Sequence, residues 1–246
     1  TNNDSKNLKS FGKQLCMHVA AQSPLAINKE DLDQEDILKW GDRLVDKIKI
    51  LDEQNIIKSE DLKVWKQNFK VNKDVLIPRP ETEHLVEEAL NIIDVDSACK
   101  LLDIGTGSGW IIISILLERR KSQGIAIDIS KKALNVAKYN AKMQHIRNRI
   151  KFINSDIDKF YLGKYDIILS NPPYIKKVEL NCLDEDVKFY EPRIALSGGV
   201  DGYSKIKAVI NKSSTLIKRK GKLFLEIGNG QTKYTTRFLR NKGFYI

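Results

Sequence analysis

The sequence predicts an α/β fold, in which a doubly wound, mostly parallel sheet follows a small N-terminal helical domain and a connecting β-hairpin. Three observations lead to this prediction. From residue 100 onward, short apolar runs alternate with segments of helical periodicity, which is the pattern of βαβ units. Before residue 69, apolar residues recur at near-helical spacing. Between these parts, two apolar, β-prone runs flank the polar turn Asn72-Lys73-Asp74, which predicts a hairpin.

These three parts define the expected domains. Residues 1–68 are expected to be helical, residues 69–80 to form the hairpin linker, and residues 81–246 to form the α/β domain. Pro78 and Pro80 end the second strand of the predicted hairpin, since proline fixes φ and lacks an N–H donor. An acidic start followed by an apolar face predicts a helix over residues 81–93.

The α/β domain is expected to contain the strands and helices of a parallel sheet covered on both faces. The strands are predicted over residues 100–104, 124–127, 150–153, 165–170 and 223–227, and the helices over 110–120, 131–142 and 204–218. Ligands of such sheets bind beyond the carboxyl ends of the strands. The functional residues are therefore expected directly after each strand.

Composition excludes several classes of protein. The chain has 246 residues, 41% of them hydrophobic and 30% charged, which allows either one large domain or a full domain with a smaller companion. Its longest apolar run, residues 110–117, is far shorter than the roughly 18 residues that cross a bilayer, and the first residues do not resemble a signal peptide. Cys16, Cys99 and Cys182 are far apart, which favours reduced thiols and a cytoplasmic protein. Because the three histidines are scattered as well, no metal site is expected.

The positive charge belongs to the second part of the chain. The net charge is +10, yet residues 1–74 hold 13 basic and 13 acidic side chains, so the remainder carries the whole excess. Most of these lysines lie on predicted helices, where a solvated face is the usual explanation. We therefore expect no direct binding of nucleic acid.

A glycine-rich turn follows the first strand of the predicted sheet. Gly105-Thr106-Gly107-Ser108-Gly109 lets the backbone turn tightly and approach a ligand closely. The run is neither the G-x-G-x-x-G of dinucleotide sites nor a P-loop, so a nucleoside triphosphate is disfavoured. Asp128 ends the second strand, where its carboxylate can accept hydrogen bonds from both hydroxyls of a ribose. Together these features favour an adenosyl ligand and leave NAD and S-adenosylmethionine both open.

The fourth strand ends in Asn171-Pro172-Pro173-Tyr174. Two prolines make this loop rigid, Asn171 offers a side-chain carbonyl, Pro172 a backbone carbonyl, and Tyr174 a flat ring. Two acceptors and a flat face suit the two N–H groups of a planar nitrogen, in an amide or an exocyclic amine. The glycine turn, Asp128 and this loop together resemble the class I S-adenosylmethionine-dependent methyltransferases that act on planar nitrogens.

Two further stretches narrow the resemblance. Val75-Leu76-Ile77-Pro78-Arg79-Pro80-Glu81-Thr82-Glu83 and Glu191-Pro192-Arg193-Ile194-Ala195-Leu196 resemble the HemK-type family, the peptide chain release factor glutamine N5-methyltransferases. The resemblance covers residues 69–245 and implies a Rossmann-like methyltransferase domain preceded by a substrate-recognition domain. It implies a release factor as partner, S-adenosylmethionine as cofactor and S-adenosylhomocysteine as product.

The resemblance also implies a role for each residue of the matching motifs. Asn171, Pro172 and Tyr174 would be catalytic, and Asn171, Pro172, Pro173 and Tyr174 would bind the substrate glutamine. The cofactor would be held by Gly105, Thr106, Gly107, Ser108, Gly109, Asp128, Ile157 and Asn171.

Other readings and two departures accompany this interpretation. The same Asn171 loop would serve an adenine-N6 methyltransferase acting on RNA or DNA, and a non-catalytic binding module would lack cofactor binding. Residues 62–68 replace the Gly-containing linker of the family, and the chain stops at residue 246, where a sixth strand and closing hairpin would be expected. We expect a monomer.

Overall fold

The computed structural model describes residues 60–183, 187 and 190–246. These residues belong to one compact unit, Lys58–Ile246. The helical domain predicted over residues 1–68 falls mostly outside the described residues. Among the helices that are described, none has the length and apolar character needed to cross a membrane.

The hairpin lies earlier in the chain than the sequence predicted. Strands β1 (Glu60–Val64) and β2 (Gln67–Val71) pair antiparallel. Trp65 and Lys66 form the two-residue turn with φ values of 48° and 70°, and positive φ at both positions is the geometry that joins twisted strands. The expected turn at Asn72-Lys73-Asp74 does exist, but it directs the chain away from the hairpin. The Asn72 side chain accepts a hydrogen bond from the backbone N–H of Asp74 at 3.0 Å, which favours a bend rather than a continued ladder.

The central sheet has five parallel strands in the order β5-β4-β3-β6-β7. Their bounds are β3 (Lys100–Ile104), β4 (Gln123–Asp128), β5 (Ile150–Asn154), β6 (Tyr165–Ser170) and β7 (Ile217–Leu225). Each predicted strand is confirmed, although β7 begins earlier than residue 223. The extra residues pair irregularly, because a register shift and a positive φ of 68° at Lys220 interrupt the ladder with β6.

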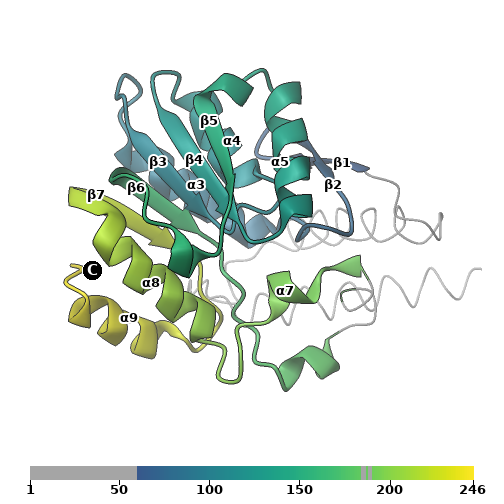
Figure 1. Ribbon diagram of the computed structural model, residues 1–246, viewed down its shortest axis with the longest axis vertical. Coiled ribbons are helices and arrows are strands. Elements are labelled where there is room, and N and C mark those ends of the chain that lie inside the picture. The colour runs from purple at the N-terminus through teal and green to yellow at the C-terminus, as the bar shows by residue number, and fades with distance from the viewer. Residues whose placement is uncertain (1–59, 184–186, 188–189) are drawn as a thin grey trace, which may run out of the picture. The chain divides into compact units, whose positions relative to one another are not determined.

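Helices cover both faces of the sheet, as Figure 1 shows. On one face, α3 (Glu83–Ile92) and α4 (Trp110–Glu118) pack around Leu101 and Ile167. On the other, α8 (Ser204–Leu216) packs against Leu102 and Ile168. The doubly wound parallel fold predicted from the sequence is therefore confirmed. The helices α5 (Lys131–Met143), α7 (Arg193–Leu196) and α9 (Thr232–Asn241), and the 3₁₀ turns Pro80–Thr82, Arg147–Arg149, Ile157–Lys159 and Glu179–Cys182, complete the described elements.

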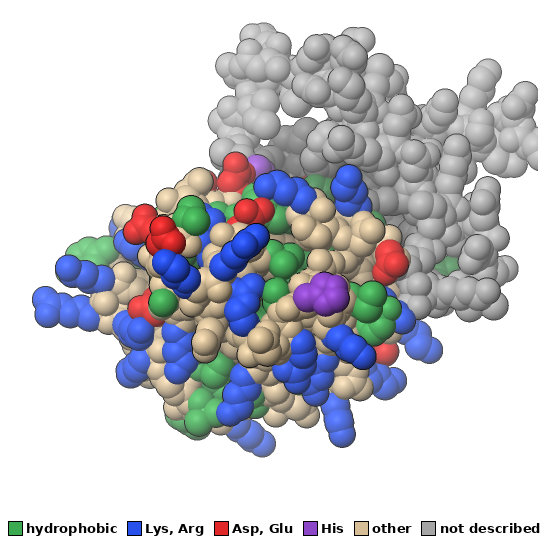
Figure 2. All heavy atoms as spheres, turned by 90° about the horizontal axis from the view of Figure 1, so that it is seen from above, with side chains coloured by type: hydrophobic (Ala, Val, Ile, Leu, Met, Phe, Trp, Pro, Cys, Tyr) green, Lys and Arg blue, Asp and Glu red, His purple; other side chains and the backbone are tan. Residues whose placement is uncertain are grey.

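Lysine and arginine side chains spread over the face seen in Figure 2, with few carboxylates among them. Several cations near the amino ends of the strands already have partners within the fold. Lys121 pairs with Asp96 at 2.8 Å, and the Arg149 guanidinium donates to the carbonyl oxygen of Leu116 at 2.7 Å. Part of the protein's positive charge therefore serves the structure itself.

One buried amide fastens the hairpin to the sheet domain. The side chain of Asn140, on α5, accepts from the N–H of Lys70 at 2.8 Å and donates to the Lys70 carbonyl at 3.0 Å. The same amide donates to the carbonyl of Ser108 at 2.8 Å. A single side chain thus completes the edge of β2 and holds the glycine-rich turn.

Replacing this amide is expected to destabilise the fold. Asn140→Ala leaves the partly buried backbone groups of Lys70 and the buried carbonyl of Ser108 without partners, which costs about 2–3 kcal/mol of unfolding free energy. Urea titration measures this loss. Asn135→Ala, at an exposed position of the same helix, serves as the control and should change the free energy by less than about 0.5 kcal/mol. Equal values for the two variants would contradict the anchoring role of Asn140.

Candidate active site

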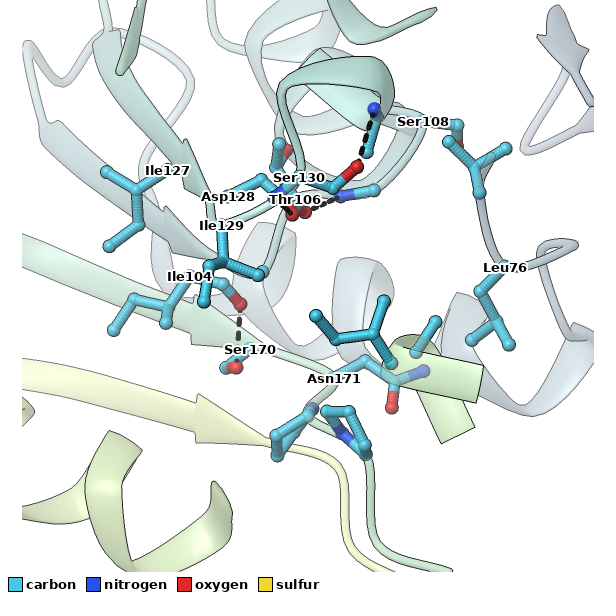
Figure 3. A pocket seen from close by; sticks show the side chains of 18 of the residues that line it. Leu76, Ile104, Thr106, Ser108, Ile127, Asp128, Ile129, Ser130, Ser170 and Asn171 are labelled. Carbon is cyan, nitrogen blue, oxygen red and sulfur yellow. Dashed lines mark hydrogen bonds between the residues drawn. The ribbon is translucent and has the colours of Figure 1, made fainter. Parts of the chain in front are cut away.

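A pocket lies at the carboxyl edge of the sheet, where the loops after four strands converge (Figure 3). The loops after β3, β4 and β5 form one side, and the loop after β6 forms the other. The pocket is also lined by residues of the segment before α3, including Leu76 and Arg79, by residues of α7, and by Lys205 and Val209 of α8. The pocket therefore lies where the rule that ligands bind beyond the strand ends would place a site.

The glycine-rich turn leaves β3 with positive φ values of 72°, 56° and 82° at its three glycines. Residues Gly105 to Ser108 line the pocket, and a Cβ atom placed at Gly107 would meet nothing within 4 Å. At Gly107 the backbone therefore borders the cavity with no side chain in between. Gly109 has a different role, because its Cβ would stand 2.9 Å from that of Ala137 and would force α4 away from α5.

Asp103 lies behind this turn with none of its surface exposed. Its Oδ2 accepts a hydrogen bond of 2.6 Å from the Thr106 hydroxyl, while Oδ1 has no partner among the described residues. Burial raises the pKa of the Asp103 carboxyl to about 7, against the lowering effect of the Thr106 hydrogen bond. This carboxyl therefore changes charge near neutral pH.

Asp128 faces the pocket at the end of β4. Its two carboxylate oxygens accept from the backbone N–H groups of Gly107 at 2.9 Å and Ser130 at 2.8 Å. Burial raises its pKa, and these two hydrogen bonds oppose the shift. Each oxygen keeps a further lone pair, so Asp128 can shape the glycine turn and still accept from a ligand.

The loop after β6 presents two free acceptors to the pocket. The Asn171 amide donates through Nδ2 to the Thr82 hydroxyl at 3.1 Å, whereas its Oδ1 accepts nothing from the described residues. The carbonyl of Pro172 is likewise without a donor among them. Asn171, Pro172 and Pro173 all line the cavity, so the two acceptors belong to consecutive residues of a loop that the prolines make rigid.

Tyr174 does not line the pocket. Its hydroxyl donates to Oε1 of Glu226 at 3.4 Å, and burial together with the nearby Glu226 carboxyl raises the pKa of the tyrosine well above its usual range. The structure thus brings together Gly105 to Ser108, Asp128, Ile157 and Asn171 to Pro173. The two predicted residues outside that lining are Gly109 and Tyr174.

Sequence reasoning missed several residues around the pocket. Glu226 directly follows β7, so the rule that pointed to Asp128 and Asn171 could have found it. Arg79 and Glu191 belong to the two stretches on which the family resemblance was based, and their side chains pair at 2.5 Å. Burial raises the pKa of Glu191, partly offset by the Arg79 charge.

Comparison with known proteins identifies the sheet domain. A family model described as a methyltransferase domain matches residues 95–239. A solved ribosomal protein L11 methylase from Lactobacillus delbrueckii subsp. bulgaricus shares the fold, with a TM-score of 0.52 at 19% identity over 68% of this chain and 71% of that one.

Curated relatives confirm the resemblance to the release factor glutamine methyltransferases. A protein of that name from Clostridium acetobutylicum is 39% identical over 180 residues, which cover 72% of this chain and 63% of that protein. Another from Enterococcus faecalis is 41% identical over 162 residues, covering 65% and 57% respectively. The chain spans about six-tenths of the length of the curated relatives it matches.

The buried Asp103 carboxyl predicts a specific dependence of stability on pH. Its pKa in the folded protein, about 7, exceeds the ordinary aspartate value of 3.8, so the folded state holds the proton more tightly than the unfolded chain. The stabilisation is complete below about pH 4 and is lost as the pH rises through about 7. Asp103→Asn should flatten the fall in unfolding free energy across this window, as measured by urea titration at several pH values. Asp94→Asn, at an exposed carboxyl, should keep the wild-type slope, and an unchanged slope in Asp103→Asn would refute the assignment.

Proposed function

Because the chain belongs to the family of methyltransferase domains, we propose that it methylates the side-chain amide nitrogen, N5, of a glutamine in a protein. The substrate is the glutamine of the Gly-Gly-Gln motif of peptide chain release factors, and the methyl donor is S-adenosylmethionine. The relatives named release factor glutamine methyltransferase support this substrate. The observation that carries the proposal is the pair of free acceptors, Asn171 Oδ1 and the Pro172 carbonyl, at the carboxyl edge of the sheet.

The pocket fits the proposed cofactor. The bare backbone of Gly105 and Gly107 leaves room for the methionine part, since a Cβ at either position would project into open space. Asp128 would hold the ribose through its remaining lone pairs, and Ile157 would pack beside the adenine. S-adenosylmethionine, when bound, supplies an electrophilic methyl group on a sulfonium and leaves as S-adenosylhomocysteine.

The chain's own residues would make a poor nucleophile competent. An amide nitrogen reacts weakly because its lone pair is delocalised. Oδ1 of Asn171 and the carbonyl of Pro172 would accept hydrogen bonds from its two N–H groups, turn the lone pair towards the methyl group and stabilise the positive charge that develops. The N–C bond would form as the C–S bond breaks, and one amide proton would then be lost to water. Correct orientation of two reactants can lower the activation free energy by on the order of 7–11 kcal/mol. The rigid Pro172-Pro173 backbone would fix that orientation.

The adenine-N6 alternative gains no support from the comparisons, which name release factors as the substrates of the relatives. The expectations of a monomer and of a cytoplasmic location stay predictions. No cluster of three or more His, Cys, Asp or Glu side chains that could hold a metal ion is found in the described part of the chain.

Incubation with labelled S-adenosylmethionine tests the substrate directly. We expect the label on a release factor and none on the same factor with Gln→Ala in its Gly-Gly-Gln motif. Total RNA and DNA, offered in parallel, should stay unlabelled. Label on nucleic acid, or on the mutated factor, would contradict the proposal.

A pair of variants tests the division of the pocket into cofactor and substrate halves. Asn171→Ala should lower kcat by about 100-fold or more, because it removes one acceptor of the reacting amide, while the Kd for S-adenosylmethionine stays near the wild-type value. Asp128→Asn should instead weaken cofactor binding by about 10-fold, because it disturbs the ribose contact. Calorimetric titration and turnover assays measure both effects. Equal losses of binding and turnover in both variants would refute the division.

A further inference from the structure

Behind Asn171 lies a group of polar side chains that the proposed mechanism does not yet use. We call Asn171, Thr82, Tyr174 and Glu226 the Glu226 network. They come from three places in the chain: the 3₁₀ turn Pro80–Thr82, the loop after β6 and the residue after β7. The backbone N–H of Glu226 donates to the Ser170 carbonyl at 3.0 Å, which holds the end of β7 beside the start of the Asn171 loop.

The direction of the Asn171 amide decides what the pocket offers. An amide has a donor end and an acceptor end of nearly equal size, so its surroundings must select which end faces the substrate. Here Nδ2 donates to the hydroxyl of Thr82, a side chain with 1% exposure, at 3.1 Å. The Thr82 hydroxyl keeps one hydrogen to donate, and it can donate only where an acceptor is close.

The carboxyl of Glu226 can supply that acceptor, since hydrogen bonding from Thr82 is among the causes that lower its pKa. Its Oε1 accepts from the Tyr174 hydroxyl at 3.4 Å, and its Oε2 is buried with no partner among the described residues. Thr82 and Asn171 lie near enough for their side chains to lower the pKa of the Glu226 carboxyl through hydrogen bonding. An ionised carboxylate accepts only. Donation from the Thr82 hydroxyl to the free Oε2 would therefore give a chain of donors that runs in one direction, from Asn171 through Thr82 to Glu226.

We propose that Glu226 is a positioning residue whose carboxylate, acting through Thr82, orients the Asn171 amide so that Oδ1 faces the substrate nitrogen. This inference rests on the proposed function, because it concerns the acceptor that binds the glutamine amide. Glu226 does not itself line the pocket. Its effect therefore reaches the substrate only through the orientation of Asn171.

The charge of Glu226 makes this effect depend on pH. Burial raises the pKa of its carboxyl, and so does the neighbouring Glu81 of the 3₁₀ turn, while the hydrogen bonds from Thr82, Tyr174 and Asn171 lower it. Arg79 acts on the same surroundings, since its charge lowers the pKa of Tyr174. The net direction for Glu226 is upward. A protonated Glu226 could donate to Thr82 and release the fixed direction, so turnover should fall as the pH drops through its pKa.

Glu226→Gln is the sharpest variant, because it keeps the size of the side chain and adds a donor. We expect kcat for release factor methylation to fall by about 10- to 100-fold, with an unchanged Kd for S-adenosylmethionine. The fall of kcat on the acid side should disappear in this variant. Glu88→Gln, at an exposed position of α3, is the matched control and should keep both the wild-type kcat and its pH profile.

The Thr82 position offers a second test that does not depend on the folding of Glu226→Gln. Thr82→Ser keeps the hydroxyl and should keep most of the turnover, whereas Thr82→Val keeps the shape and should lose about as much kcat as Glu226→Gln. Similar kcat values for the Ser and Val variants would overturn the inference. A folded Glu226→Gln variant that keeps the wild-type kcat and the wild-type fall of kcat at low pH would overturn the inference as well.

A spectroscopic readout separates this inference from the proposed function. The side-chain ¹H–¹⁵N resonances of Asn171, assigned by their absence in Asn171→Asp, should titrate with pH in the wild-type protein and not in Glu226→Gln. This measurement needs no turnover. An inactive wild type whose Asn171 resonances titrate as expected would refute the substrate and support the positioning role, whereas resonances that ignore Glu226 would refute the role itself.

Discussion

The site depends on the adjacency of β3 and β6 at the carboxyl edge of the sheet. The two strands pair in parallel, with Asp103 opposite Leu169, so both chains leave the sheet at the same level. The Ser170 hydroxyl then donates to the Ile104 carbonyl at 2.8 Å, in a region without solvent exposure (Figure 3). The glycine-rich turn begins on one side of this hydrogen bond and the Asn171 loop on the other. Because group transfer tolerates little error in position, this fixed separation is what lets the two loops act on a pair of reactants.

Buried carboxyl groups hold the walls of the pocket in place. Asp103, Asp128, Glu191 and Glu226 all have a raised pKa, and burial is the largest cause in each case. Such groups are costly to bury unless their partners are well placed. A carboxylate in return fixes the direction of every donor that surrounds it, which neutral amides and hydroxyls cannot do. In this fold each of the four groups lies beside a turn or loop of the pocket. Each unfavourable burial therefore accompanies a backbone segment or side chain whose orientation the carboxyl group fixes.

The sequence predicted the sheet well because the hydrophobic pattern of a buried strand is local. Residues 100–104 and 165–170 were predicted with the bounds that the structure shows. The hairpin was misplaced because Trp65 and Lys66 are not typical residues of a tight turn, and only the pairing of β1 with β2 imposes their positive φ. Tyr174 was expected in the pocket because its motif is contiguous, but the chain turns after Pro173 and directs the ring to Glu226. The position of Glu226 directly after β7 follows the strand-end rule, but its role had no local signal, since its partner Tyr174 lies more than fifty residues away in sequence.

The order of the strands explains how the two halves of the pocket divide the chemistry. The winding of the sheet reverses between β3 and β6, and at such a switch point the loops on either side diverge and leave a crevice. The loops after β3, β4 and β5 form the half assigned to the cofactor. Residues after β6, supported by Glu226 after β7 and by Thr82 before α3, form the half assigned to the substrate. Because the halves come from different loops, the acceptor pair on Asn171 and Pro172 can be tuned for an amide without altering the glycine-rich turn. Under the proposed function, selectivity for glutamine should therefore depend on the network behind Asn171 more than on any residue that touches the cofactor.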